Sequence, residues 1–170
     1  MFQAFYPEEY VSSTYEIPFE ALYQRGIRGV IFDIDNTLVP HGEPADEKAV
    51  VLFRRLKALG IDTCLLSNNK EPRVSSFAGQ VGSRYIAKGG KPGVKNYRKA
   101  MELMGTDCAS TVFVGDQLFT DVYGAKKTGI YSILVKPIHP KEEIQIVIKR
   151  RLEAVVLWEY QRQLRRKQHD

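Results

Sequence analysis

Long hydrophobic runs, patterned cysteines and a glycine-rich turn are all missing from this sequence of 170 residues. No apolar run reaches the roughly eighteen residues of a membrane-spanning helix, so we expect none. The first residues lack a positively charged segment followed by an apolar core, so no secretory signal is expected. The two cysteines, Cys64 and Cys108, form no paired framework. We therefore expect reduced thiols and a cytosolic setting.

Two further absences narrow the class of protein. Histidine and cysteine form no cluster of the kind that holds zinc. The turn after the first apolar run reads DNTLVPHG, and this cannot replace the glycine-rich turn of a dinucleotide-binding fold.

What is present is typical of one globular domain covering residues 1–170, with 44% hydrophobic and 26% charged residues. Residues 1–28 form an N-terminal leader in which the segment PFEALYQRGI is expected to be a helix packed on the core. The formal net charge is +5, and the last thirty residues hold eight Lys/Arg against five Asp/Glu. A basic end favours an anionic partner, although a solvated helix face explains most such runs.

Short apolar runs alternate with helical patterns along the chain. Strands are expected at 29–35, 62–67, 84–87, 111–116 and 131–136, and helices at 45–59, 72–80, 93–104 and 120–128. Strands separated by helices of about ten residues indicate βαβ units, and continuous apolar runs indicate strands buried on both faces. The predicted fold class is α/β, doubly wound, with a parallel five-stranded sheet and helices on both faces.

The C-terminal segment 141–167 is expected to be an amphipathic basic helix. Its apolar stripe consists of Ile144, Val147, Ile148, Leu152, Val155, Val156 and Leu157. This stripe could pack against the sheet, or it could lie on an anionic membrane surface as a peripheral contact. Trp158 on the same helix is interpreted as a core or partner contact rather than a ligand site.

Two aspartates, Asp33 and Asp35, follow the first apolar run directly. Residues two apart share one face of a strand, and open α/β sheets bind ligands at the carboxyl ends of their strands. Two close carboxylates stay ionised together only if a cation or strong donors share the site. Taken alone, the pair is equally well explained as a strand cap or an Asx-turn.

Later strands add polar residues at the same expected edge. Ser67 and Asn68 follow the second strand, where a small hydroxyl can bind a phosphate, although an isolated serine is more often a turn residue. The segment AKGGKPG then offers two lysines, of which Lys91 is preferred and Lys88 is the alternative.

The fourth strand ends in VFVGDQLFTD, which adds Asp116 and Asp121. Carboxylate oxygens converging on one sheet edge favour Mg²⁺ over zinc. Response-regulator receivers also have an acidic Mg²⁺ site, but they lack the DxD pair.

The order DIDNT, strand-end serine, lysine before a helix and GDxxxxD resembles the haloacid-dehalogenase (HAD) superfamily of phosphotransferases, from about Gly29 to Val135. The longer segments RGVIFDIDNTLVP and LGIDTCLLSNNKEPRV are similar to the YqeG family of subclass IIIA phosphatases. That family is itself similar to the mitochondrial phosphatidylglycerophosphatases. The resemblance implies an HAD-like, Rossmann-like sheet.

The resemblance also implies roles. Asp33 would be the nucleophile that forms an aspartyl-phosphate, and Asp35 the general acid and base, with a main-chain carbonyl for Mg²⁺. Ser67, Asn68 and Lys91 would bind the substrate phosphate. Asp33, Asp35 and Asp116 would hold the metal. Aspartate rather than threonine at the second DxD position indicates a phosphatase rather than an ATPase pump.

Asp121 has three open interpretations: a metal ligand acting through water, a residue that orients Lys91, or a cap for the helix near Thr120. His41 lies six residues beyond Asp35, within reach of a substrate, although an isolated loop histidine is usually exposed and without function.

The places where HAD enzymes insert cap domains are short here. The stretch from Asn36 to Gly60 has 25 residues and the stretch from Asn68 to Arg84 has 17, too few for a separate domain. An open site could reach the phosphate of a bulky substrate, such as a lipid headgroup, a protein or a nucleic-acid end. An uncapped enzyme could also close its site by forming a homo-oligomer.

The predicted function is a Mg²⁺-dependent phosphomonoester hydrolase, with phosphatidylglycerophosphate as one plausible substrate. The alternative is a non-catalytic HAD-fold protein that binds RNA or an assembly factor through its basic C-terminal helix. The complete set of catalytic positions argues against that alternative, so nucleic acid is not the expected partner.

Overall fold

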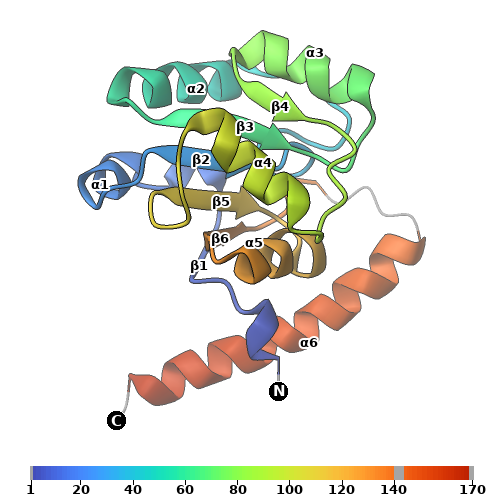
Figure 1. Ribbon diagram of the computed structural model, residues 1–170. Coiled ribbons are helices and arrows are strands. Elements are labelled where there is room, and N and C mark those ends of the chain that lie inside the picture. The colour runs from blue at the N-terminus through green and yellow to red at the C-terminus, as the bar shows by residue number, and fades with distance from the viewer. Residues whose placement is uncertain (1, 140–143, 169–170) are drawn as a thin grey trace.

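A six-stranded, all-parallel sheet forms the centre of the computed structural model, which describes residues 2–139 and 144–168 (Figure 1). Its strands, in the spatial order β1-β6-β5-β2-β3-β4, are β1 (Glu9–Val11), β6 (Tyr131–Val135), β5 (Thr111–Gly115), β2 (Gly29–Phe32), β3 (Asp62–Leu66) and β4 (Arg84–Ile86). The five predicted strands are all present, but the count of five is wrong. The sixth strand, β1, comes from the N-terminal segment and pairs with β6 at the edge of the sheet.

The central strands are buried on both faces, as their continuous apolar sequences predict. Along β2, Val30 and Phe32 pack into one hydrophobic cluster, and Ile31 packs into a second cluster on the opposite face. In β5, Val112 and Val114 alternate with Phe113 in the same way. This alternation follows from the two-residue period of a strand.

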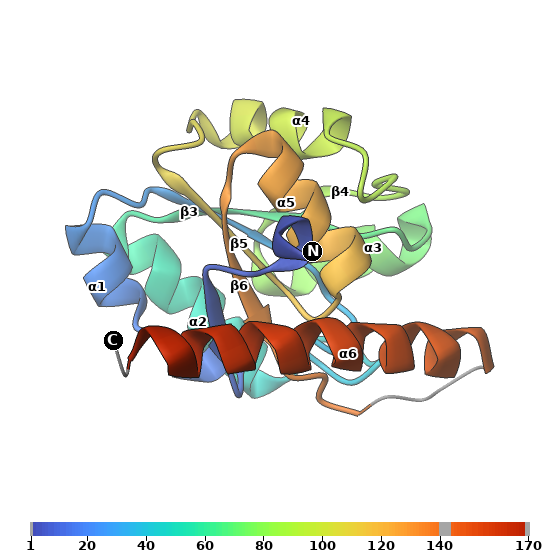
Figure 2. The same ribbon diagram turned by 90° about the horizontal axis from the view of Figure 1, so that it is seen from below.

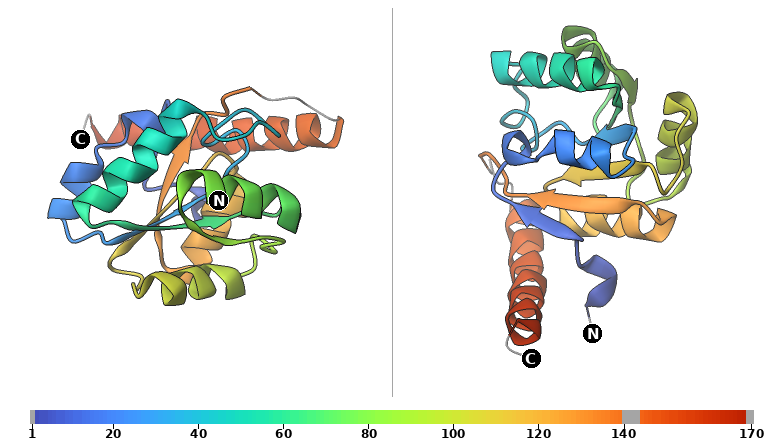
Figure 3. Two further views of the ribbon diagram at one scale, coloured as in Figure 1. Left: turned by 90° about the horizontal axis from the view of Figure 1, so that it is seen from above. Right: turned by 90° about the vertical axis from the view of Figure 1, so that its left-hand side faces the viewer.

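Helices cover both faces of the sheet, as Figures 1 and 3 show. The first cluster contains side chains of α1 (Phe19–Gln24), α2 (Glu47–Leu59) and α3 (Glu71–Val81). The second contains side chains of α4 (Lys95–Met104) and α5 (Tyr123–Thr128). Shorter turns are the 3₁₀-helices Gln3–Phe5 and Thr14–Glu16 and the π-helix Leu118–Val122, which leads directly into α5.

Helix ends follow local chemistry. At the start of α2, Asp46 Oδ1 accepts a hydrogen bond from the main-chain N–H of Ala49 at 2.9 Å, which satisfies one of the free donors of the first turn. The same helix ends at Gly60, whose φ of 87° is the left-handed conformation that glycine adopts without a steric penalty. These two signals place α2 within two residues of its predicted range.

The register of the central strands brings the polar residues together. Phe32 pairs with Leu65 of β3 on one side and with Val114 of β5 on the other. The residues that follow these strands therefore meet at one edge of the sheet. Only a loop of residues 33–46 separates β2 from α2, and residues 67–70 alone separate β3 from α3, so no cap domain interrupts the described chain.

The last helix, α6 (Ile144–Lys167), lies along the β1–β6 side of the molecule beside the N-terminal segment (Figure 2). Residues 141–143 of the predicted helix, and the side chains of Ile144 and Val147, lie outside the described part. Of the predicted stripe, Val156 is buried but Ile148, Leu152 and Val155 are exposed, so the stripe does not pack as one unit. Among the described helices, none combines the length and apolar character needed to cross a membrane.

Candidate active site

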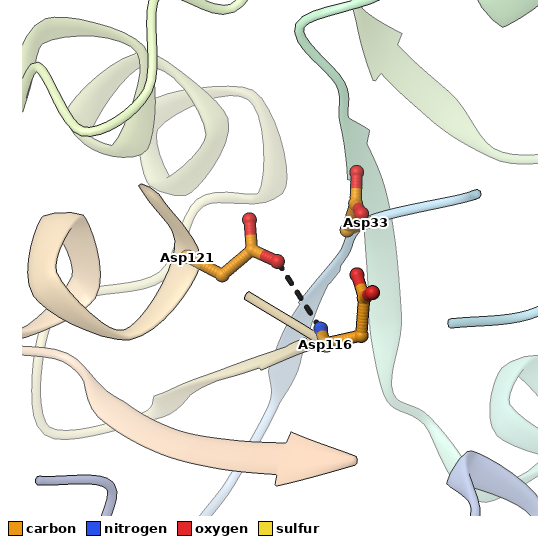
Figure 4. Close-up of side chains that lie close together, drawn as sticks. All are labelled: Asp33, Asp116 and Asp121. Atoms are coloured by element: carbon orange, nitrogen blue, oxygen red, sulfur yellow. Dashed lines mark hydrogen bonds between the residues drawn. The ribbon is translucent and has the colours of Figure 1, made fainter. Parts of the chain in front are cut away.

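Asp33 stands directly after β2, and the hydrophobic strand holds it in place at the sheet edge (Figure 4). Its main-chain N–H donates to the carbonyl oxygen of Val114 at 3.0 Å, which continues the sheet ladder by one residue. Its carboxylate is buried and accepts a hydrogen bond from Lys91 Nζ at 3.0 Å. The buried, fixed carboxylate is therefore paired with a buried cation.

Lys91 binds two carboxylates at once. Besides Asp33, its Nζ donates to Asp121 Oδ1 at 2.6 Å. Burial alone would lower the pKa of Lys91, but attraction by Asp121 and Asp33 outweighs burial and raises it. The backbone of Lys91 is held as well, since Asn68 Oδ1 accepts from its N–H at 2.8 Å and Asn68 Nδ2 donates to its carbonyl at 3.2 Å. Lys88 is exposed, so the structure brings Lys91 to the carboxylates.

Asp121 lies in the π-helix Leu118–Val122 and is fully buried. Its Oδ2 accepts from the main-chain N–H groups of Asp116 and Gln117, both at 3.1 Å. This carboxylate packs so closely on Gly115 that a Cβ atom there would overlap it. The contact with Lys91 fits the interpretation of Asp121 as a residue that orients Lys91, and its role as a metal ligand stays a prediction.

Asp116 follows β5 and faces Asp33 across the strand ends (Figure 4). Its Oδ1 accepts from Thr37 Oγ1 at 3.3 Å, and its Oδ2 forms an ion pair with Arg150 of α6 at 2.7 Å. Burial and the neighbouring Asp121 raise the pKa of Asp116, and Arg150 opposes that shift. Arg150 also pairs with the buried Glu153 at 3.3 Å, so α6 contributes directly to this site.

Three carboxylates form a cluster able to hold a metal ion. One oxygen each from Asp33, Asp116 and Asp121 lies within 4.8 Å of the others, and all three residues are buried. Burial, with the repulsion of the other two carboxylates, raises the pKa of Asp33 well above its ordinary value despite Lys91. Among the residues that the structure describes, these three negative groups form ion pairs with two cations, Lys91 and Arg150, so a divalent cation fits both the oxygen donors and the charge.

Asp35 lies apart from this cluster, in a network of donors. Its Oδ1 accepts from the Gly42 N–H at 2.8 Å and from Arg73 at 2.9 Å, and its Oδ2 accepts from Asn69 at 3.3 Å. Burial alone would raise the pKa of Asp35, but the hydrogen bonds from Gly42 and Arg73 outweigh it and lower that pKa. The exposed His41 lies 4.0 Å from the same carboxylate.

Ser67 follows β3 directly and lines the same site. It is 2% exposed, and its Oγ accepts from the Asn69 N–H at 3.1 Å, which leaves the hydroxyl hydrogen available for a ligand. A cavity of about 300 Å³ opens here. It is lined by Asp33, Asp35, His41, Ser67, Asn68, Asn69, Lys91, Gln117 and Thr120.

The predicted site residues are thus gathered at one sheet edge, but two arginines that contact them were missed. Arg73 lies in the segment SNNKEPRV, in the first turn of a helix predicted just after the second strand. This position near the sheet edge could have indicated a contact with the site. Arg150 gave no signal, because only the docking of α6 brings it to Asp116. The side chain of Asn68 is engaged with the Lys91 backbone, so its binding of phosphate stays a prediction.

Comparison with known proteins gives the family. The model of the haloacid dehalogenase-like hydrolases matches residues 43–129. "Probable phosphatase YqeG" of Bacillus subtilis is 37% identical over 90% of both chains. The chloroplastic and mitochondrial phosphatidylglycerophosphate phosphatase 1 of Arabidopsis thaliana is 27% identical over 83% of this chain and 44% of its own length.

Solved structures share the fold at lower identity. A putative subfamily IIIA HAD hydrolase from Legionella pneumophila superposes with a TM-score of 0.55 at 18% identity, covering 71% of this chain and 72% of its own. A 3-deoxy-D-manno-octulosonate 8-phosphate phosphatase from Moraxella catarrhalis, solved with magnesium and phosphate, gives 0.54 at 17%, covering 71% and 75%. The chain belongs to the haloacid dehalogenase-like hydrolases, and within them it is a phosphatase of the YqeG type.

Proposed function

We propose that the protein is a Mg²⁺-dependent phosphomonoester hydrolase that works through an aspartyl-phosphate on Asp33, with residues 1–170 acting as one domain. One observation carries this proposal. Asp33 and Lys91 form a buried, hydrogen-bonded ion pair, with 3.0 Å between Lys91 Nζ and Asp33 Oδ1, and two further buried carboxylates lie beside it. A buried aspartate tends to bind a proton, whereas a nucleophile has to be ionised. Lys91 supplies one of the positive charges that keep Asp33 ionised.

Asp33, Asp116 and the main-chain carbonyl of Asp35 would hold Mg²⁺, with Asp121 near enough to contribute. When bound, the ion would neutralise negative charge on the transferring phosphoryl group and on the carboxylates around it. Oxygen donors without a histidine or cysteine among them suit this hard cation.

The reaction divides into two displacements at phosphorus. In the first, the Asp33 carboxylate forms a bond to phosphorus while the bond to the ester oxygen breaks, and Asp35 gives its proton to the departing alcohol. In the second, Asp35 takes a proton from water, which replaces the one it gave, and the water oxygen forms a bond to phosphorus while the bond from phosphorus to Asp33 breaks. Inorganic phosphate is released and the Asp33 carboxylate is restored. Ser67 would donate its free hydroxyl hydrogen to a phosphoryl oxygen, and Lys91 would offset the charge of both phosphate and nucleophile.

The substrate we propose is a bulky phosphate ester, with phosphatidylglycerophosphate as the first candidate. The open cavity and the short loops at both cap positions support a large leaving group. The similarity to the Arabidopsis enzyme supports a lipid phosphate. Peripheral contact with an anionic membrane surface fits such a substrate and forms part of the proposal, as does closure of the site by a homo-oligomer.

The test is hydrolysis of p-nitrophenyl phosphate with and without Mg²⁺, followed by a panel of lipid, sugar, nucleotide and peptide phosphates. We expect EDTA to abolish turnover. We expect Asp33→Asn to abolish turnover as well, together with the acid-stable phosphate that the aspartyl-phosphate intermediate leaves on the protein. Asp62→Asn, at the far end of β3 with 39% of its side chain exposed, is the matched control and should keep full activity. Full activity in Asp33→Asn would refute the assignment of the nucleophile. No turnover on any ester would favour the non-catalytic alternative.

A further inference from the structure

Helix α6 turns several large apolar side chains toward solvent. Ile148, Leu152 and Trp158 are each 58% exposed and Val155 is 55% exposed. These four residues are called the outer face of α6. In the view from below, no other element lies in front of the helix (Figure 2). Contiguous exposed side chains of this size mark an interaction surface rather than an ordinary solvated helix.

The opposite side of α6 fixes the helix in this orientation. Glu153 is 4% exposed, and its Oε1 accepts from the main-chain N–H of Leu118 at 3.1 Å. One turn on, Val156 is buried, and the ring of Tyr160 packs 5.1 Å from that of Tyr6. Rotating the outer face inward would break these contacts and expose a buried carboxylate. The outer face therefore stays turned outward in the folded protein.

The charge of α6 defines what kind of partner fits. Residues 144–168 hold seven Lys/Arg against two glutamates, a net charge of +5 that equals the formal charge of the whole chain. Arg151 and Arg162 are spaced i−4 and i+7 from Val155, so they flank the outer face. The guanidinium of Arg162 lies 5.4 Å from the centre of the Trp158 ring. Apolar side chains and exposed arginines thus share one side of the helix.

Of three candidate partners, a second copy of the chain, a nucleic acid and an anionic bilayer, the bilayer is the one that uses both features. A second copy of the chain would place two helices of charge +5 against each other, which is unfavourable. A nucleic acid would neutralise the arginines but leave the outer face without apolar contacts. An anionic bilayer accepts apolar and aromatic side chains at the boundary of the acyl chains and offers phosphates to the flanking arginines.

We propose that the outer face of α6, with Arg151, Arg162 and the exposed Arg165, seven residues beyond Trp158, binds the surface of an anionic lipid bilayer. The inference deepens the proposed function, on which it rests only in that a phosphatase lying on a bilayer meets phosphate esters there. The inner side of the same helix carries Arg150 to Asp116, so the membrane-binding element also contacts the catalytic site.

Because the chain has a single tryptophan, Trp158, its fluorescence can report binding of the outer face to lipid without an added fluorescent label. The full-length protein is titrated with vesicles of equimolar phosphatidylglycerol and phosphatidylcholine, and with vesicles of phosphatidylcholine alone. We expect the emission of Trp158 to shift to shorter wavelength and to be quenched by brominated acyl chains with the anionic vesicles only. Raising the salt concentration should weaken binding.

Matched variants assign the surface. Arg162→Gln combined with Arg165→Gln removes two charges from α6 and should weaken vesicle binding roughly thirtyfold. Arg54→Gln combined with Lys57→Gln removes the same charge from exposed positions on α2 and should leave binding unchanged. Circular dichroism checks that each variant is folded.

An unchanged Trp158 emission with anionic vesicles would overturn the proposal, and so would equal binding to neutral vesicles or an equal loss in the α2 control. A shift of emission with single-stranded RNA but not with vesicles would replace the bilayer with a nucleic acid. Hydrolysis of soluble p-nitrophenyl phosphate is measured in the same samples. Vesicle binding without turnover refutes the proposed hydrolase reaction but not the docking surface. Turnover without vesicle binding refutes the docking surface, and with it the proposed membrane contact, but not the hydrolase reaction.

Discussion

Lys91 is a buried cation shared by two carboxylates, and its replacement by methionine should destabilise the protein strongly. The side chain is 3% exposed and donates to Asp33 at 3.0 Å and to Asp121 at 2.6 Å. Methionine fills a similar volume but has no charge and no donor. Asp33 and Asp121 would then remain buried with no partner for the oxygens that Lys91 now contacts.

The magnitude follows from what is left behind. Removing one partner of a buried ion pair costs about 3–5 kcal/mol, because the remaining charge is neither solvated nor neutralised. Here two carboxylates lose the same partner, and Asp116 adds a third negative group nearby. We therefore expect a loss of about 4 kcal/mol in the free energy of unfolding near neutral pH.

The pH dependence has a definite sign. Burial raises the pKa of Asp33 above that of the unfolded chain, so the folded state binds the proton more readily. The stabilisation that comes with this proton is present below the unfolded pKa and is lost as pH rises through the folded pKa. Without Lys91 the folded pKa rises further. The deficit of Lys91→Met should therefore shrink as the pH falls from about 7 to about 5.

Urea unfolding of wild type and Lys91→Met at the two pH values measures this. Lys88→Met is the matched control, because Lys88 is exposed, and it should change stability by less than about 0.5 kcal/mol. Adding Asp121→Asn to Lys91→Met removes one unpaired charge and should recover part of the loss. A loss below about 1 kcal/mol, or a loss independent of pH, would refute the argument that Lys91 compensates buried carboxylates.

Three more substitutions test other contacts of the site. Gly115→Ala places a Cβ against the Asp121 carboxylate and should cost about 1–3 kcal/mol in urea unfolding. Arg73→Met removes a donor that lowers the pKa of Asp35, so that pKa rises. Because Asp35 must hold a proton to protonate the leaving group, the high-pH limb of kcat should move to higher pH. Glu153→Leu leaves the buried main-chain N–H of Leu118 without its acceptor and should lower the free energy of unfolding by about 1–3 kcal/mol, again measured by urea unfolding.

Each of these has its own control. Gly79→Ala, in the interior of α3 with open space around its Cα, should be neutral or stabilising. Arg84→Met, at an exposed ion pair with Asp62, should leave the pH profile of kcat in place. Glu153→Gln keeps an acceptor oxygen and should therefore lose less stability than Glu153→Leu. An unshifted profile in Arg73→Met would show that Asp35 does not control the high-pH limb.

Secondary structure was predictable to within a few residues wherever a strong apolar period met a clear end signal. Strand β1 was missed because Glu9–Val11 spans only three residues, all partly exposed, and shows no apolar run. Its identity as a strand comes from pairing with β6, which no local pattern records. The π-helix before α5 was also missed, since the sequence gives it the same apolar spacing as the start of an ordinary helix.

Site residues that follow strands could be placed from the sequence, because the carboxyl ends of parallel strands share one edge. Asp33, Ser67 and Asp116 are of this kind. The partners that set their electrostatics could not be placed in the same way. Arg150 reaches Asp116 from α6, and the sequence does not fix which side of that helix meets the sheet: a single apolar stripe was predicted, but Val156 is buried while Leu152 is exposed.

The carboxylate of Asp121 has a consequence for the slow motions of the site. The main-chain N–H groups of Asp116 and Gln117 follow the last residue of β5, where amide hydrogens usually exchange quickly with solvent. Both donate instead to Oδ2 of the fully buried Asp121, and the other oxygen of that carboxylate, Oδ1, accepts a hydrogen bond from Lys91. These two amides can exchange only when the lysine, the π-helix and the strand end separate together. The catalytic edge should therefore open as one cooperative unit with the sheet, rather than fray as a loop.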